Sequence, residues 1–393
     1  MVSHKKNLFV IAVIAVVNAL GYGIIIPILY SYSQKFGLTD FENGLLFSVF
    51  SVFQFFSTPI IGRLSDKYGR KPLLLISLAG TALSFLTMAF APSAIFLFLA
   101  RALDGITAGN IPVASAVISD TTAPKDRARG FGIIGAAFGF GFVFGPAISA
   151  LTIGFGIQTP FLIAAAVTLV AIALTAFVLP ETNTFEREVS KAKFFDFGKL
   201  MRSVMDENVG LTLLLSLFYS FAFALYIYAF QPFAVKNLGM SPTIISINFT
   251  LVGLVGLIAQ AVLIPRAVKA FGERKVLVGA LVGSTLAFIG IFLSDFIALF
   301  VAMTAVQALA NSFVGPMIQT LLSKEMDERS QGSILGLNSS YISIGTIFGP
   351  VAGGAIATLS VHAPFLAAGA VVGLCVYLSL KILHRHMRKL AAF

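Results

Sequence analysis

The sequence predicts an all-α membrane protein with twelve transmembrane helices in two pseudo-symmetric six-helix halves. Hydrophobic residues make up 58% of the chain and charged residues only 11%, a far more apolar composition than that of a soluble domain. About twelve apolar runs approach the roughly 20 residues that a helix needs to cross a hydrocarbon core about 30 Å thick. The runs lack the alternation of apolar and polar residues found in membrane strands, so helices are predicted throughout.

The predicted spans follow one another along the whole chain. Their approximate edges are 8–30, 43–62, 72–91, 94–120, 129–153, 159–179, 208–231, 242–265, 275–294, 297–322, 331–357 and 363–383. The first run follows Lys5 and Lys6, but no small-residue cleavage site comes after it. We therefore interpret it as a retained helix and not as a removed signal peptide.

An internal duplication accounts for the two halves. Four features recur 202–204 residues later and in the same order. They are Arg127 and Gly130 with Arg329 and Gly332, Gly145-Pro146 with Gly349-Pro350, Pro160-Phe161 with Pro364-Phe365, and Tyr68-Gly69 with the faint copy Phe271-Gly272. A long polar stretch separates the copies. We predict a six-helix bundle at residues 1–180, a cytoplasmic linker at 181–207 and a second six-helix bundle at 208–393.

The basic residues predict the orientation in the membrane. If the N-terminus is placed in the cytoplasm, 24 of the 27 Lys and Arg residues fall in cytoplasmic segments, and only Lys35 and Lys236 lie outside. Because segments rich in Lys and Arg stay in the cytoplasm, we predict a multi-pass protein of the plasma membrane with both termini cytoplasmic. The bases are spread over the membrane-adjacent segments, so the net charge of +10 favours a lipid bilayer with anionic headgroups as partner over nucleic acid.

A charged motif connects the second and third predicted spans. The stretch Gly62-Arg63-Leu64-Ser65-Asp66-Lys67-Tyr68-Gly69-Arg70-Lys71-Pro72 is too polar for hydrocarbon, so it predicts a tight turn at a membrane face. Gly62 would let helices approach closely, and Gly69 would permit a left-handed backbone. The pattern G-x-L-x-D-x-x-G-R-K resembles the signature between the second and third helices of the major facilitator superfamily of transporters. On another interpretation, the basic residues only enforce topology.

That resemblance implies the fold of the superfamily, with a substrate cavity between the halves near the bilayer midplane. It also implies a conformational latch. Asp66 would cap the N-terminus of the eleventh helix, near residues 330–332, where the helix dipole attracts a carboxylate. Arg70 would pair with Asp120, and Arg127 would complete the cluster.

The fourth predicted span contains Arg101 and Asp104, in a segment that resembles the R-x-x-x-G motif of the same superfamily. At 1.5 Å per residue, Asp104 lies about 15 Å from the start of the span and so near the bilayer centre. It is the one acid among the 17 of the chain that we place there. The pair could be a buried ion pair that holds two helices together. Alternatively, burial disfavours the charged carboxylate while Arg101 favours it, which could make Asp104 a proton-coupling site.

The fifth span favours export. Its segment Gly141 to Ala150, with Gly145 and Pro146, resembles the G-x-x-x-G-P-x-x-G-G motif of antiporters, although Ser149-Ala150 replaces the final glycines. The complete form occurs in the eleventh span as Gly345 to Gly354, with Gly349 and Pro350. Small residues four apart allow close helix packing and proline bends a helix, so packing alone would also explain the motif.

Within the superfamily, the chain resembles the twelve-span drug:proton antiporters, particularly the tetracycline-exporter-like branch. The acid that such exporters carry in the first helix is Asn18 here. Polar residues stranded in apolar spans are candidates for lining the substrate cavity. They are Asn18, Tyr22, Asn110, Tyr219, Tyr226, Asn248, Gln307, Asn311, Asn338 and Tyr341. Together with 39 phenylalanines, they predict a largely aromatic and uncharged cavity suited to a lipophilic solute.

The leading hypothesis is therefore a secondary active transporter that exports lipophilic small molecules by proton-coupled alternating access. An importer or facilitator of a small metabolite or nutrient on the same fold is the alternative, because a fold does not settle function. A receptor, scaffold or intramembrane enzyme has little support, since the polar segments are too short to form a domain and no metal-binding set or nucleophile motif is found. We expect no cofactor and no metal. The expected partners are a small-molecule substrate, protons and lipid, with the chain acting as a monomer.

Overall fold

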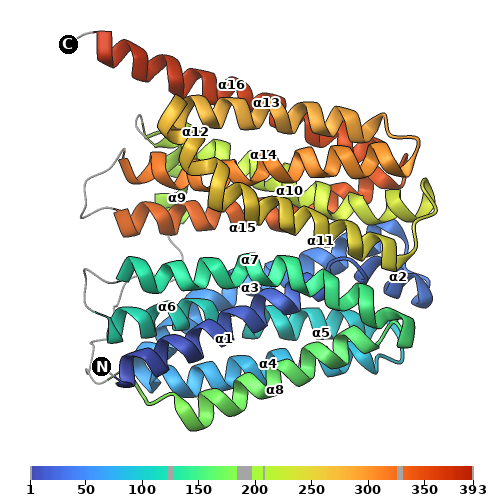
Figure 1. Cartoon of the computed structure of the whole chain (residues 1–393), viewed down its shortest axis with the longest axis vertical. Coiled ribbons are helices and arrows are strands. Elements are labelled where there is room, and N and C mark those ends of the chain that lie inside the picture. The colour runs from blue at the N-terminus through green and yellow to red at the C-terminus, as the bar shows by residue number, and fades with distance from the viewer. Residues whose placement is uncertain (1, 123–126, 184–196, 207–208, 325–330, 392–393) are drawn as a thin grey trace. The chain divides into compact units, whose positions relative to one another are not determined.

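The protein is built of helices. The computed structural model describes residues 2–122, 127–183, 197–206, 209–324 and 331–391 (Figure 1). Within these ranges, every regular element is helical, and twelve helices are long and apolar enough to cross a membrane. The prediction of an all-α protein with twelve transmembrane helices is confirmed.

The helices of the first half follow the predicted spans. They are α1 (Val2–Ile25), α2 (Leu29–Ser33), α3 (Asp40–Tyr68), α4 (Arg70–Ala89), α5 (Ala94–Thr107), α6 (Asn110–Thr121), α7 (Arg127–Thr152) and α8 (Thr159–Val178), with short 3₁₀ turns at Gln34–Phe36 and Ile153–Phe155. After α9 (Phe197–Val204) come the helices of the second half. They are α10 (Gly210–Lys236), α11 (Pro242–Ile258), the π-helical segment η4 (Ala259–Leu263), α12 (Ile264–Phe271), α13 (Glu273–Phe292), α14 (Ile297–Lys324), α15 (Gln331–Ala357) and α16 (Ala363–Ala391).

The charged motif of residues 62–72 is mostly helical, so the prediction of a turn over this whole stretch is wrong. Helix α3 continues to Tyr68 and α4 begins at Arg70, with only Gly69 between them. A helix satisfies its own backbone groups, and its charged side chains can still reach water beyond the hydrocarbon. Gly69 has φ 102°, which L-residues with a Cβ rarely adopt. Among the described residues, no atom lies within 4 Å of a Cβ built on Gly62, so this structure has no close helix contact there.

The predicted span 94–120 is interrupted at its middle. Helix α5 ends at Thr107 and α6 starts at Asn110. Pro112 has no N–H to donate to Ala108, so the helical hydrogen-bond ladder fails at this point. A side chain at position 109 would collide with α3, because a Cβ on Gly109 would lie 2.4 Å from the Ile61 side chain. The break thus begins within four residues after Asp104.

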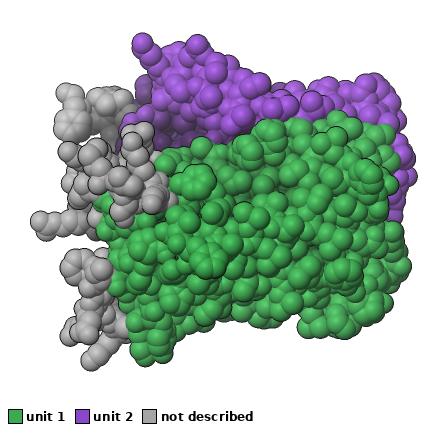
Figure 2. Space-filling model, turned by 60° about the horizontal axis from the view of Figure 1, so that its bottom comes forward, with its two compact units in different colours: residues 1–39, 49–194, 241–250 green, residues 40–48, 195–240, 251–393 purple. Residues whose placement is uncertain are grey.

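Two compact units divide the chain (Figure 2). Unit 1 comprises residues 1–39, 49–194 and 241–250, and unit 2 comprises residues 40–48, 195–240 and 251–393. The first turns of α3 thus group with unit 2, and the first turns of α11 group with unit 1. The domain boundaries at residues 180 and 208 stay a prediction.

The two units repeat one pattern of neighbouring helices. In unit 1, α1 packs on α7 and α8, and α4 packs on α5 and α8. In unit 2, α10 packs on α15 and α16, and α13 packs on α14 and α16. The sequence duplication is therefore also present in the packing of each unit. Even the glycine turns match, because Gly272 before α13 has φ 76° and ψ 157°, against 102° and 156° for Gly69.

Glycines bring the central helices of each unit into backbone contact. A Cβ on Gly141 of α7 would lie 2.2 Å from the Ala19 Cβ of α1, and one on Gly145 would lie 2.8 Å from the Gly23 Cα. In unit 2, a Cβ on Gly349 of α15 would lie 2.6 Å from the Phe221 carbonyl oxygen of α10. Such close approach maximises van der Waals contact between helices that lipid does not drive together.

Ser149, which departs from the antiporter pattern, takes part in the same packing. Its Oγ donates a hydrogen bond of 3.1 Å to the backbone oxygen of Ile24 in α1. Pro27 follows shortly, and the Ile28 N–H bonds to Ile25 O, so the Ile24 oxygen is available to a side chain from α7. A hydroxyl at this position therefore stabilises the bent end of α1.

We predict that Gly141→Ala destabilises the protein and that Gly135→Ala, one turn and a half earlier on α7, does not. The added methyl at position 141 must displace α1, and overpacking of this kind costs about 1–3 kcal/mol. No described atom lies within 4 Å of a Cβ on Gly135, so that substitution should leave stability unchanged or raise it by up to about 1 kcal/mol. Unfolding of the two purified variants in detergent measures the difference, and equal midpoints would contradict the prediction.

Candidate functional site

Arg101 and Asp104 form an ion pair inside unit 1. Both residues lie on α5 and are buried, with Arg101 Nη1 3.3 Å from Asp104 Oδ2. Thr81 of α4 donates a hydrogen bond of 3.3 Å to the other carboxylate oxygen, Oδ1. Arg101 Nε has no hydrogen-bond partner among the described residues. A buried guanidinium with an unused N–H group can donate one more hydrogen bond to a suitable acceptor.

Aromatic rings form one wall beside this ion pair. The Arg101 guanidinium carbon lies 4.4 Å from the centre of the Phe50 ring, a distance suited to a cation–π contact. Tyr22 of α1 lies 6.4 Å from Phe50 and 6.0 Å from Phe142 of α7, measured between ring centres. The predicted cavity residue Tyr22 and the predicted ion pair are thus joined through Phe50.

Asn18 and Asn110 contact each other. Asn18 Nδ2 of α1 donates a hydrogen bond to Asn110 Oδ1 at the start of α6. Asn110 is buried, and its Nδ2 has no partner among the described residues. Asn248 is buried in α11, in the segment that groups with unit 1. The break between α5 and α6 places Asn110 so that it faces α1.

Several predicted cavity residues of unit 2 form hydrogen bonds between helices. Tyr219 OH of α10 donates to Asn311 Oδ1 of α14 at 2.9 Å. Ser216 Oγ donates to Asn338 Oδ1 of α15 at 2.5 Å. Ser284 Oγ of α13 donates to Gln307 Oε1 of α14 at 2.7 Å, and Gln307 Nε2 has no partner in the described part of the chain. These contacts link α10, α13, α14 and α15 by uncharged groups only.

Tyr226 and Tyr341, two further predicted cavity residues, contact neighbouring elements of unit 2. Tyr226 is buried, with its ring centre 5.3 Å from that of Phe288 and 6.3 Å from that of Phe365. Tyr341 OH donates to Leu200 O of α9 at 2.6 Å. The hydroxyl of Tyr341 therefore fixes the short helix α9 to α15.

The position in unit 2 that corresponds to Asp104 is occupied by an uncharged residue, Gln307. Gln307 and Ser284 follow Asp104 and Thr81 by 203 residues each, within the offset of the duplication. In unit 1, the Thr81 hydroxyl of α4 donates to the Asp104 carboxylate of α5. In unit 2, the Ser284 hydroxyl of α13 donates to the side-chain carbonyl of Gln307 of α14. The hydrogen bond is thus kept, but Gln307 cannot release a proton at any ordinary pH. Only the unit 1 copy can change its charge.

Arg70 is the centre of the charged cluster at the Tyr68 end of α3. Its Nη2 lies 2.7 Å from Asp66 Oδ1, and its Nε lies 2.9 Å from Asp120 Oδ2 at the end of α6. Its Nη1 also donates to Ser65 Oγ at 2.7 Å. Only 2% of the Arg70 side chain is exposed. Two carboxylates and a hydroxyl thus compensate the burial of one guanidinium.

Glu181 belongs to the same cluster, although the sequence analysis assigned it only to the linker. Its carboxylate accepts hydrogen bonds from the backbone N–H groups of Arg70 at 2.9 Å and Lys71 at 3.1 Å, and so caps the N-terminus of α4. A Cβ on Gly69 would lie 2.4 Å from Glu181 Oε2. Partial burial alone would raise the pKa of Glu181, but the N–H donors outweigh it and lower the pKa.

Other parts of the predicted latch cannot be placed. The side chains of Arg127 and of residues 331–333 lie outside the described residues, as do residues 325–330 entirely. The repeat nevertheless gives a counterpart to the Arg70–Asp120 pair. Glu273 and Lys324 occupy the matching positions with the charges exchanged, and Lys324 Nζ lies 2.6 Å from Glu273 Oε1.

Another ion pair, which the sequence analysis did not find, lies at the Asp40 end of α3. Lys236 Nζ of α10 lies 2.7 Å from Asp40 Oδ2, and Tyr228 OH donates to the Asp40 backbone oxygen. A Cβ on Gly44 would lie 2.4 Å from Pro350 O of α15. These contacts hold the first turns of α3 against α10 and α15 within unit 2.

The described residues contain no group of three or more His, Cys, Asp or Glu side chains that could hold a metal ion. Cys375 is buried in α16.

Comparisons with known proteins agree with this geometry. The family model described as the Major Facilitator Superfamily matches residues 11–221 and 212–392. The chain belongs to the major facilitator superfamily of membrane transporters. It is 30% identical to multidrug resistance protein 2 of Bacillus subtilis (strain 168), with 94% of each chain covered. It is 29% identical to the class H tetracycline resistance protein of Pasteurella multocida, with 88% of each chain covered.

A solved structure shares the fold. The crystal structure of the human organic anion transporter MFSD10 (TETRAN) matches with a TM-score of 0.73 at 21% identity, covering 96% of this chain and 99% of that chain. The family match and the twelve apolar helices together make the protein a multi-pass membrane protein of a transporter family.

We predict that Glu181→Gln lowers stability at neutral pH because the amide keeps only one acceptor oxygen for the α4 N-terminus. The loss of a helix cap costs roughly 1 kcal/mol. Since folding lowers the pKa of Glu181, its contribution is complete above the usual pKa of Glu and is lost as the pH falls through the lowered value. The difference between wild type and variant in detergent unfolding should therefore shrink in acid.

The exposed carboxylate Asp295, changed to Asn, is the control for the loss of one negative charge. A Glu181→Gln difference that persisted unchanged at low pH would contradict capping by the charged carboxylate.

Proposed function

We propose that this protein exports lipophilic small molecules by proton-coupled alternating access. The observation that carries the proposal is Asp104, a buried carboxylate held by one cation and one hydroxyl, whose counterpart in the other unit is the neutral Gln307. Relatives named for multidrug and tetracycline resistance, which match most of the chain, support the same class of function. Buried acids in transport proteins are commonly proton sites.

The proton would act by weakening the pair with Arg101. A charged Asp104 neutralises the guanidinium, whereas a protonated Asp104 leaves Arg101 buried with less compensation. Arg101 would then turn toward another acceptor of the protein, and a substrate polar group held at its Nε would be released. Proton and substrate would thereby lower each other's affinity, which is the reciprocal coupling that proton-for-substrate exchange needs.

The surroundings of the pair support a lipophilic substrate. Tyr22, Phe50 and Phe142 offer aromatic surface beside Arg101, and the Asn18–Asn110 pair adds an amide with an unused donor. Aromatic surface with a few polar groups is typical of sites for apolar ligands. Because Asn18 carries no charge, this wall of unit 1 does not select for a cationic solute.

The remaining features of the proposal follow from the sequence. We propose a monomer in the plasma membrane with both termini in the cytoplasm, because of the distribution of Lys and Arg. In this orientation the Arg70 cluster is cytoplasmic. Asp66 keeps 36% of its side chain accessible, so it could bind an added partner such as the N-terminus of α15 and act as a latch.

We predict that Asp104→Asn abolishes uphill transport driven by a pH gradient in proteoliposomes but keeps measurable downhill exchange. Asparagine can still accept from Thr81, but it cannot carry a proton. Asp295→Asn removes an exposed carboxylate and should retain both modes. Full pH-driven accumulation by Asp104→Asn would exclude Asp104 as the proton carrier, and loss of both modes would indicate a structural ion pair.

We predict that Asp66→Asn reduces the population in which the cytoplasmic ends of α3 and α15 are close together. Removal of the anion would eliminate a contact that only this state makes. Distances between spin labels on the two helices, measured in the wild type and the variant, give the populations. Lys67→Gln, a neighbouring change that removes a cation, serves as the control, and unchanged distance distributions in Asp66→Asn would argue against the latch.

A further inference from the structure

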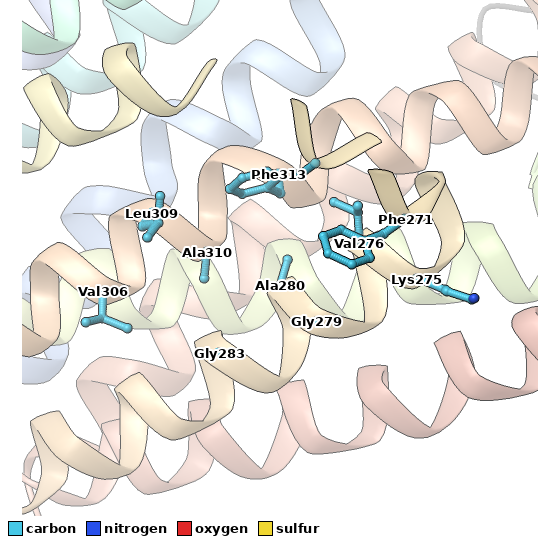
Figure 3. Close-up of a pocket in the computed structure, with 11 residues that line it drawn as sticks. Phe271, Lys275, Val276, Gly279, Ala280, Gly283, Val306, Leu309, Ala310 and Phe313 are labelled. Atoms are coloured by element: carbon cyan, nitrogen blue, oxygen red, sulfur yellow. The ribbon is translucent and has the colours of Figure 1, made fainter. Parts of the chain in front are cut away.

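A groove in unit 2 lies between α12, α13 and α14 (Figure 3). Its volume is about 390 Å³. The small residues Gly279 and Gly283 of α13 and Ala310 of α14 line it, as do Phe271 and Phe313. No described atom lies within 4 Å of a Cβ on Gly279, so the groove is open above this glycine.

Among the described residues that line the groove, Lys275 is the one that carries a charge. It lies at the end that contains Phe271, and its Nζ points away from the apolar residues (Figure 3). The chain around it is basic, because residues 259–283 hold four cations and the single acid Glu273. These cations are Arg266, Lys269, Arg274 and Lys275. Glu273 is paired with Lys324 of α14, so the segment keeps an excess of positive charge.

The dimensions of the groove suit a hydrocarbon chain that enters from the charged end. From Lys275 to Gly283 the groove follows eight residues of α13, or about 12 Å at 1.5 Å per residue. That is roughly a third or more of a hydrocarbon core about 30 Å thick. Lysine near such an end places its ammonium at the headgroup level while its methylenes lie along apolar surface.

We propose that this groove binds an anionic glycerophospholipid, with the phosphate at Lys275 and one acyl chain along Gly279 and Gly283. Apolar walls alone would accept any lipid tail. The cations of the α12–α13 connection select a headgroup with net negative charge, because each Lys or Arg near an anionic headgroup adds attraction. The site lies on unit 2, apart from Arg101 and Asp104, and it does not depend on the proposed transport function.

A bound lipid would also restrict the movement of α12. The π-helical segment η4 comes directly before α12, and Pro265 lies in the first turn of α12. Both features weaken the continuous hydrogen-bond ladder between α11 and α12. Ala267 and Phe271 of α12 line the groove, so a lipid chain packed there would hold α12 against α13 and α14.

The test uses the full-length protein, purified and delipidated in detergent. Dioleoylphosphatidylglycerol or dioleoylphosphatidylcholine is added, and bound lipid is counted by native mass spectrometry while the thermal midpoint is recorded. A phosphatidylglycerol with a photoreactive diazirine in one acyl chain then reports the place of binding through labelled peptides. The variants are Lys275→Gln and Gly279→Leu. Their controls are Lys35→Gln and Gly373→Leu, since Gly373 on α16 also has no described atom within 4 Å of its Cβ position.

Phosphatidylglycerol should bind more tightly than phosphatidylcholine and should label peptides of α13 and α14. Lys275→Gln should weaken phosphatidylglycerol binding about fivefold, and Gly279→Leu should abolish the labelling, with both controls unchanged. If Gly279→Leu does not fold, labelling in Lys275→Gln alone decides.

Three results would overturn the proposal. One is equal binding of the two lipids, with no effect of either variant. Another is stabilisation of the protein by inorganic phosphate alone, which would indicate an anion site. The third is displacement of the photoreactive lipid by a lipophilic compound that the protein transports, which would make the groove a substrate site.

Discussion

The backbone contact of α7 with α1, and of α15 with α10, is the interaction on which the rest of the structure depends. Lipid tails are as apolar as the side chains, so close packing replaces the hydrophobic effect as the force between these helices. Gly141 and Gly145 allow that packing in unit 1, and Gly349 allows it in unit 2. Because α1 is fixed in this way, Asn18 reaches Asn110 and Tyr22 reaches the ring beside Arg101. The polar site therefore depends on glycines that carry no chemistry.

Much of the fold could be predicted from the sequence, because the hydrocarbon core imposes a fixed length and helical structure on every span. The Arg70–Asp120 contact could also be anticipated, since a motif resemblance names both residues. Glu181, Asp40 and Lys236 were missed for a physical reason. Each contacts a segment more than 100 residues away in the chain, and nothing in the local sequence separates such an acid from an ordinary solvated one. The contact of Tyr341 with a backbone oxygen of α9 was also missed, because a partner of this kind leaves no mark in the local sequence.

The two units share a backbone plan but differ in their charges, and the differences are informative. At the centre, an acid in unit 1 stands where unit 2 has an amide, with the same hydroxyl contact in each. A buried charge costs far more than a buried amide unless it is compensated. The chain therefore retains that cost in only one unit, and Arg101, with its aromatic neighbour Phe50, supplies the compensation there.

The turns at Gly69 in unit 1 and Gly272 in unit 2 also differ in the charges around them. Arg70 is nearly inaccessible and bound by two carboxylates, so the turn of unit 1 is a closed and nearly neutral cluster. In unit 2, the exchanged pair of Glu273 and Lys324 is more exposed, with 56% of the Lys324 side chain accessible. Its neighbours Arg274 and Lys275 add positive charge beside an apolar groove. A duplicated turn that keeps its backbone, with φ positive at Gly69 and Gly272 alike, thus differs between the units in how far its positive charge is compensated. The closed cluster suits contact within protein, whereas the open, basic turn suits contact with the anionic surface of a membrane.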